Sequence, residues 1–205
     1  MSSTNLYRLS GVAIIVGALL DIASQLMQQF IATPTVDQGA IAGWLAVIGT
    51  SVLLLGASGL LARVARAIGT VGLIGFVALY IGGAMQGVGG GMLDFVFPFL
   101  QQAAPKAVNG PPPATMMVYF NVGGIVQLIG CLLLGIALLR RSGLANWTRA
   151  AAALLLVGGL VNAVASLANL PGIIGLVAIV VFFIGFGMYG VALVSERRVE
   201  VAEEQ

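Results

Sequence analysis

Long apolar runs alternate with short polar or charged clusters along almost the whole chain. A helix needs about 20 apolar residues to cross a bilayer. Six runs of suitable length can be drawn: residues 8–30, 40–62, 66–88, 115–139, 149–168 and 171–194. Backbone groups in lipid need internal partners, and the barrel-type alternation of polar and apolar residues is missing. The pattern therefore predicts an all-α integral membrane protein, a six-transmembrane-helix bundle forming a single transmembrane domain over residues 1–205.

The basic residues are distributed unevenly between the two sides of this six-span arrangement. Only Lys106 falls on one side, and all the arginines fall on the other: Arg8, Arg63, Arg66, Arg140, Arg141, Arg149, Arg197 and Arg198. Positive charge is retained on the cytoplasmic side of membrane proteins. We therefore expect both termini to be cytoplasmic, with residues 195–205 as a cytoplasmic tail, and we expect the membrane to be the bacterial inner membrane.

The connection after the third run is the longest in the chain. Gly89, Gly90 and Gly91 are expected to break the third helix, because glycine disfavours helix interiors. The apolar stretch that follows, residues 92–103, is then too short to span. We therefore expect residues 92–103 to form an interfacial or re-entrant segment. Two interpretations of this segment are open: it is an inert interfacial helix, or it serves as a lid or dimer contact.

Three of the runs begin alike, with an arginine followed nine residues later by a glycine: Arg8 with Gly17, Arg66 with Gly75, and Arg149 with Gly158. Four residues beyond the glycine, the run that begins at Arg8 has Asp21 and the run that begins at Arg149 has Asn162. This pattern predicts three helical hairpins related by a pseudo-threefold axis along the membrane normal. The alternative is coincidence, which 29 glycines make easy.

Composition narrows the possible functions. Hydrophobic residues make up 60% of the chain, charged residues only 8%, and the mean hydropathy is +1.08. The spans leave no room for a soluble catalytic domain, and the thinly spread net charge of +2 argues against nucleic-acid binding. Histidine is absent and Cys131 is the single cysteine, so we expect neither an enzyme nor a metal or other cofactor site.

Asp21 is the main candidate for chemistry inside the membrane. It lies thirteen residues after Arg8, or about 20 Å along a helix, which places it in the outer half of the bilayer. An ionised carboxylate there costs on the order of 2.5–3.5 kcal/mol, so it should face the bundle interior and either be protonated or find donors. We expect an outward-opening polar cavity that binds a ligand or ion through Asp21, Ser24, Gln25, Gln86, Asn121, Asn162 and Ser166.

Each of these polar groups also has a plainer interpretation, as a hydrogen-bond contact between helices worth about 0.6 kcal/mol. Gln127 could line a pathway or bond a neighbouring helix, and we favour the latter; Asp94 is expected to be a solvated carboxylate. A stripe of small residues suited to helix packing recurs every fourth position at Gly83, Gly87 and Gly91.

The sequence therefore favours a small multi-pass protein whose outward-facing polar cavity binds or passes a small or lipid-like ligand. The competing interpretation is a non-catalytic structural or accessory subunit of a larger membrane complex or homo-oligomer. The expected partners are the lipid bilayer, the ligand of the first interpretation, and protein copies or subunits of the second.

Overall fold

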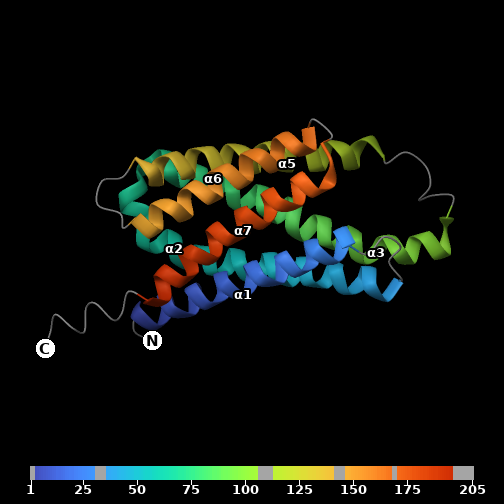
Figure 1. Cartoon of the computed structure of the whole chain (residues 1–205), viewed down its shortest axis with the longest axis horizontal. Helices are drawn as coiled ribbons and strands as arrows, with labels where there is room; N and C mark the ends of the chain where they lie inside the picture. Colours follow the sequence, from blue (N-terminus) through green and yellow to red (C-terminus); the bar gives the residue numbers. More distant parts are fainter. Residues whose placement is uncertain (1–2, 31–35, 106–112, 141–145, 168–169, 196–205) are drawn as a thin grey trace, which may run out of the picture.

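The computed structural model describes residues 3–30, 36–105, 113–140, 146–167 and 170–195, and its regular structure is entirely helical within those ranges. The elements, in chain order, are α1 (Ser3–Phe30), α2 (Val36–Gly83), the π-helical turn η1 (Ala84–Val88), α3 (Gly89–Ala103), α5 (Ala114–Leu139), α6 (Asn146–Leu167) and α7 (Gly172–Ser195). Figure 1 shows them packed lengthwise, with α3 projecting beyond the other helices at one end.

The helix α2 consists of two helices joined by a sharp turn at Gly69, which has φ 63° and ψ −172°. Only glycine adopts this backbone conformation without steric cost, because it has no Cβ. We call residues 36–68 the first half of α2 and residues 70–83 the second half. The turn sends the second half back across the bundle, so that the chain makes a second and a third crossing within one continuous helical stretch.

Six helices in the described part of the chain are long and apolar enough to span a membrane: Asn5–Phe30, Asp37–Ala65, Ile68–Ala103, Ala114–Leu139, Trp147–Ala165 and Gly172–Ser195. The expectation of six long apolar helices is therefore confirmed. Five of them agree with the ranges read from the sequence to within a few residues.

The third helix differs from its expected form. The predicted break at Gly89–Gly91 is wrong, because the chain stays helical through all three glycines and on to Ala103. The disturbance is milder: the backbone widens into the π turn η1 just before them. The glycines fit the helix here because they are packed, and a methyl group added at Gly91 would lie 2.8 Å from Ala46 Cβ and 2.9 Å from Gly43 O. Close packing of this kind stabilises helices that propensity alone would not.

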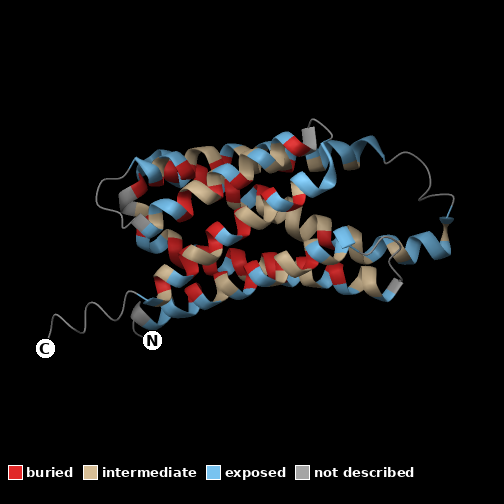
Figure 2. Ribbon diagram, viewed as in Figure 1, coloured by how far each residue is buried: buried red, intermediate tan, exposed pale blue. Residues whose placement is uncertain are grey.

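The six helices form a closed ring. α1 packs against the first half of α2 and against α7, and α6 packs against α5 and α7. The first half of α2 also contacts η1 and α3, while the second half packs on α5. Buried residues lie on the sides of the helices that face one another, and exposed residues cover the outer sides (Figure 2). Exposed apolar side chains such as Leu19, Leu55 and Val157 give this outer surface the character that lipid requires.

Backbones approach one another closely wherever glycines meet a neighbouring helix. A methyl group added at Gly17 would lie 2.5 Å from Leu53 N, and one added at Gly158 would lie 2.5 Å from Phe182 N. Lipid tails are as apolar as leucine, so membrane helices associate through tight van der Waals packing rather than through apolar burial. These glycines therefore hold the ring together, and they determine how the helices are spaced around its centre.

We predict that Gly17→Ala destabilises the protein by about 1–3 kcal/mol, because the new methyl would overlap backbone atoms of α2 that cannot move freely. The matched control is Gly187→Ala, where an added methyl has no atom within 4 Å. The control is expected to be neutral or to stabilise the helix by up to about 1 kcal/mol. Thermal unfolding in detergent measures both, and equal effects of the two substitutions would contradict the packing role of Gly17.

Candidate functional site

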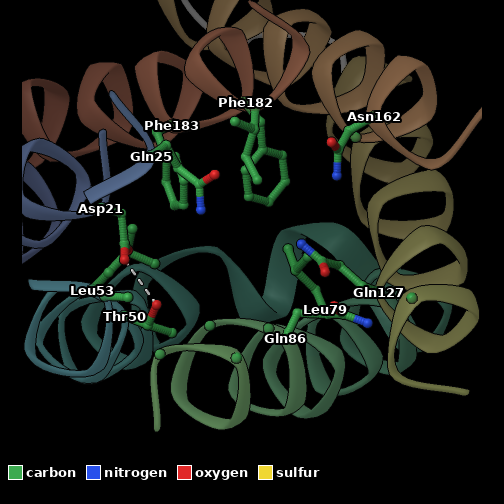
Figure 3. Close-up of a pocket in the computed structure, with 18 of the residues that line it drawn as sticks. Asp21, Gln25, Thr50, Leu53, Leu79, Gln86, Gln127, Asn162, Phe182 and Phe183 are labelled. Carbon is green, nitrogen blue, oxygen red and sulfur yellow. Dashed lines mark hydrogen bonds between the residues drawn. The ribbon is translucent and has the colours of Figure 1, made fainter. Parts of the chain in front are cut away.

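A cavity of about 360 Å³ lies at the centre of the ring, and every span contributes to its wall. Nine polar side chains line it: Asp21, Gln25, Gln28, Thr50, Gln86, Asp94, Asn121, Gln127 and Asn162. Figure 3 shows several of them converging on the same space from α1, α2, α5 and α6. A volume of this size suits a small organic molecule, since ligand pockets range from about 300 to 1,000 Å³.

Asp21 stands on the α1 side of this cavity and is only 3% exposed. Its Oδ1 accepts a hydrogen bond of 2.9 Å from the Thr50 hydroxyl of α2, drawn as the dashed line in Figure 3. Its Oδ2 is buried and has no hydrogen-bond partner among the residues that the structure describes. A buried polar atom without a partner is costly, and such atoms are rare in native proteins. Within the described residues, the protein thus satisfies only one of the two carboxylate oxygens of Asp21.

A second carboxylate, Asp94 of α3, lines the same cavity. The Gln28 side chain donates a 2.8 Å hydrogen bond from Nε2 to Asp94 Oδ2 and a 3.1 Å bond to Ser24 Oγ. Ser24 in turn donates to the carbonyl oxygen of Ala42 at 2.8 Å. This chain of hydrogen bonds connects α1, α2 and α3, and it holds Asp94 in place beside the cavity.

Amide side chains lie on the far side from Asp21. Gln86 comes from η1, Gln127 from α5 and Asn162 from α6 (Figure 3). Gln86 donates a hydrogen bond from Nε2 to the Phe120 carbonyl oxygen, which ties η1 to α5. An amide both donates and accepts hydrogen bonds, so this wall can contact a polar ligand without bringing any charge of its own.

The α7 wall is aromatic. Phe182, Phe183 and Phe186 all line the cavity and pack edge to face, with ring centroids 5.5 Å apart for Phe182 and Phe183 and 5.2 Å apart for Phe182 and Phe186. Figure 3 shows the Phe182 side chain extending toward the middle of the space. The cavity is therefore amphipathic, with acids on one side, amides on another and aromatic rings above.

The structure brings together five of the residues expected at the cavity: Asp21, Gln25, Gln86, Asn121 and Asn162. Ser24 lies instead between α1 and α2, where its side chain is fully buried. The Ser166 side chain lies outside the part of the chain that the structure describes. The glycines of the small-residue stripe turn toward the first half of α2, with Gly83 near Leu54, Gly87 against Thr50 and Gly91 against Ala46.

Four lining side chains lie outside the set of residues expected at the cavity: Gln28, Thr50, Asp94 and Gln127. For Gln127, lining a pathway was the less favoured of two interpretations. Gln28 had a detectable signal, because Asp21, Gln25 and Gln28 follow the i, i+4, i+7 spacing of one helical face. Thr50 had no such signal in the sequence, because a lone threonine in an apolar run does not reveal which helix it faces. Asp94 was placed outside the bundle only because the third helix was expected to break before it.

The described residues hold no group of three or more acidic or cysteine side chains that could bind a metal ion. The acidic side of the cavity offers charge and hydrogen-bond acceptors, but no ligand set of the kind that Zn²⁺ or Ca²⁺ requires.

We predict that Thr50→Val destabilises the protein by about 1–3 kcal/mol, because it leaves the buried Asp21 carboxylate without its hydroxyl donor. Thr50→Ser keeps the hydroxyl and serves as the control. In the background of Asp21→Asn, the difference between valine and serine should shrink. Unfolding temperatures of the four proteins form a double-mutant cycle, and a coupling of zero would show that the hydrogen bond has no energetic importance.

Comparison with known proteins gives no relative: no family model, no curated protein and no solved structure matches this chain. The function of the cavity has to be inferred from its own residues and their geometry.

Proposed function

We propose that this protein binds or passes a small or lipid-like ligand in its central cavity. The observation that carries the proposal is Asp21, a cavity-lining carboxylate that is 3% exposed and whose buried Oδ2 has no hydrogen-bond partner among the described residues. Ionisable residues within membrane spans are costly, and they commonly mark ligand or ion sites. If Asp21 served only to bond one helix to another, both of its oxygens should be paired within the bundle.

Repeated packing among the hairpins supports a central site. Each hairpin has a glycine on its first helix that lies against the backbone of the second, with a hypothetical Cβ 2.5 Å from a backbone nitrogen. The pairs are Gly17 with Leu53, Gly75 with Leu134, and Gly158 with Phe182. The contact recurs three residues further along each second helix: Gly56 meets Ile14, Ala137 meets Gly72, and Gly185 meets Leu155. The three hairpins thus have the same helix register at both contacts, as expected of three repeats about a pseudo-threefold axis.

This register makes Asp21, Leu79 and Asn162 equivalent, since each lies four residues beyond its packing glycine. All three line the cavity. The three repeats thus surround one space with one acid, one leucine and one amide. Symmetric repeats around a central site are a common plan among transport proteins.

The proposed orientation places the cavity toward the outside. α1 and α6 begin, and α5 and α7 end, at the same end of the bundle as the Gly69 turn (Figure 1). Arg8, Arg63, Arg140 and Arg149 belong to those helix ends, which makes that end cytoplasmic by the positive-inside rule. Asp21 and Asn121 lie nearer the opposite ends of their helices, consistent with a bacterial inner-membrane protein whose cavity opens outward.

We predict that a cysteine placed in the cavity reacts with a small polar thiol reagent. In a Cys131→Ala background, Asn162→Cys should be modified by hydroxyethyl methanethiosulfonate at least about 10-fold faster than Val157→Cys on the same helix. The thiolate is the reactive species, and it forms only where water reaches it. Val157 is 53% exposed, but on the outer face that lipid covers.

Labelling is followed by mass spectrometry in membranes. Equal, slow rates at both positions would indicate a dry bundle, and they would favour the alternative of a structural or accessory subunit.

For the orientation, we predict that green fluorescent protein fused after Gln205 is fluorescent in a bacterial host, and that alkaline phosphatase at the same site is inactive. Each reporter works on only one side of the inner membrane. Active phosphatase would place the arginine-rich end outside and would overturn both the orientation and the outward-facing cavity.

A further inference from the structure

We infer that the ligand of this cavity is an organic cation, an ammonium group carried on an apolar body, with Asp21 as its counter-ion. This inference rests on the proposed function, and it adds the chemical class of the ligand. The juxtaposition that supports it is a half-partnered buried carboxylate on one wall and a group of phenylalanines on another.

The charge of the cavity selects against anions. Asp21 and Asp94 both line it, and none of the described lining residues is basic. An anionic ligand would bring like charges together at low dielectric, where repulsion is strong. A neutral ligand could donate a hydrogen bond to Asp21 Oδ2, but it would leave the charge of the site unbalanced. A cation both satisfies that oxygen and neutralises the carboxylate.

The remaining walls favour an organic cation over an inorganic ion. Sodium or a divalent ion needs several oxygens grouped around it. At Asp21, the neighbouring Thr50 hydroxyl already points its hydrogen at Oδ1. Gln86, Gln127 and Asn162 stand across the cavity, and among the side chains labelled in Figure 3 only Gln25 brings an amide to the Asp21 side. A space of about 360 Å³ is also far larger than a bare ion requires. The ligand must therefore extend from the acidic side across the cavity.

The aromatic side supplies what an apolar body needs. Phe182, Phe183 and Phe186 present rings to the cavity, and Leu79 lies at the position equivalent to Asp21 in the second hairpin. Aromatic rings bury large apolar area and also attract cations through their faces. A ligand whose charged end lies by Asp21 and whose apolar end lies among these side chains would satisfy both sides of the cavity at once.

The test uses three soluble compounds that share a phenyl body and differ in charge: 2-phenylethylammonium, 2-phenylethanol and phenylacetate. Each is assayed for its ability to slow hydroxyethyl methanethiosulfonate labelling of Asn162→Cys in the purified, full-length protein at pH 7. We expect the ammonium compound to protect at a concentration at least about 10-fold lower than the alcohol. Phenylacetate is expected to be the weakest of the three.

The same assay is repeated in three variants. Asp21→Asn should reduce the preference for the ammonium over the alcohol to less than about threefold. Asp94→Asn should reduce it by a smaller factor, because Asp94 is only half-buried and solvent screens its charge more than that of Asp21. Asp37→Asn changes net charge equally, but Asp37 lies exposed in the first turn of α2, away from the cavity, and the preference should be unchanged.

The outcomes separate the two proposals. Equal protection by ammonium and alcohol in the otherwise unaltered protein would overturn the cation preference, while the ligand-binding function would stand. A preference that survives Asp21→Asn would overturn the role of Asp21. Absence of labelling at Asn162→Cys, the result of a dry bundle, would remove the proposed function and this inference with it. The comparison of compounds needs no acidic substitution, so it remains decisive if Asp21→Asn fails to fold.

Discussion

The close approach of helix backbones at glycine is the constraint on which the rest of this structure depends. In lipid, apolar side chains gain little by touching one another, and stability comes from packing at short range. Gly17, Gly75 and Gly158 each bring a first helix against the backbone of its partner. The cavity lies at the centre of the ring that these contacts help to close.

That cavity explains how a carboxylate can persist inside a membrane. Asp21 contacts no lipid, being 3% exposed, and Thr50 satisfies one of its oxygens. The other oxygen is buried without a hydrogen-bond partner among the described residues, and the free-energy cost of that remains in the folded protein. Proteins keep such unfavourable groups chiefly at functional sites, where a ligand removes the cost by binding. The unpaired Asp21 Oδ2 therefore accounts for the energetic cost of the site and is also the main support for its proposed function.

The three hairpins contribute unequally to this site. The positions four residues beyond the three packing glycines carry Asp21, Leu79 and Asn162, and three of the lining phenylalanines lie on α7 while Phe120 lies on α5. The cavity is therefore asymmetric, with charge at one side and apolar surface at another. Under the proposed function, such a division would orient an amphipathic ligand, because turning the ligand around would place its apolar body against the acid and its charge against the rings.

Hydrophobic run lengths alone determined that the chain has six long helices, and the helical face from Asp21 to Gln28 was readable from spacing. This succeeded because lipid leaves a backbone few options, so that run length translates directly into a spanning helix. Only the tertiary structure decided that Thr50 bonds Asp21, that Ser24 turns away from the cavity, and that the third helix continues through Gly89–Gly91 to bring Asp94 inside. Those outcomes depend on contacts between residues distant in sequence. Glycines that would destabilise an isolated helix are compatible with a continuous one when a neighbouring backbone packs against them.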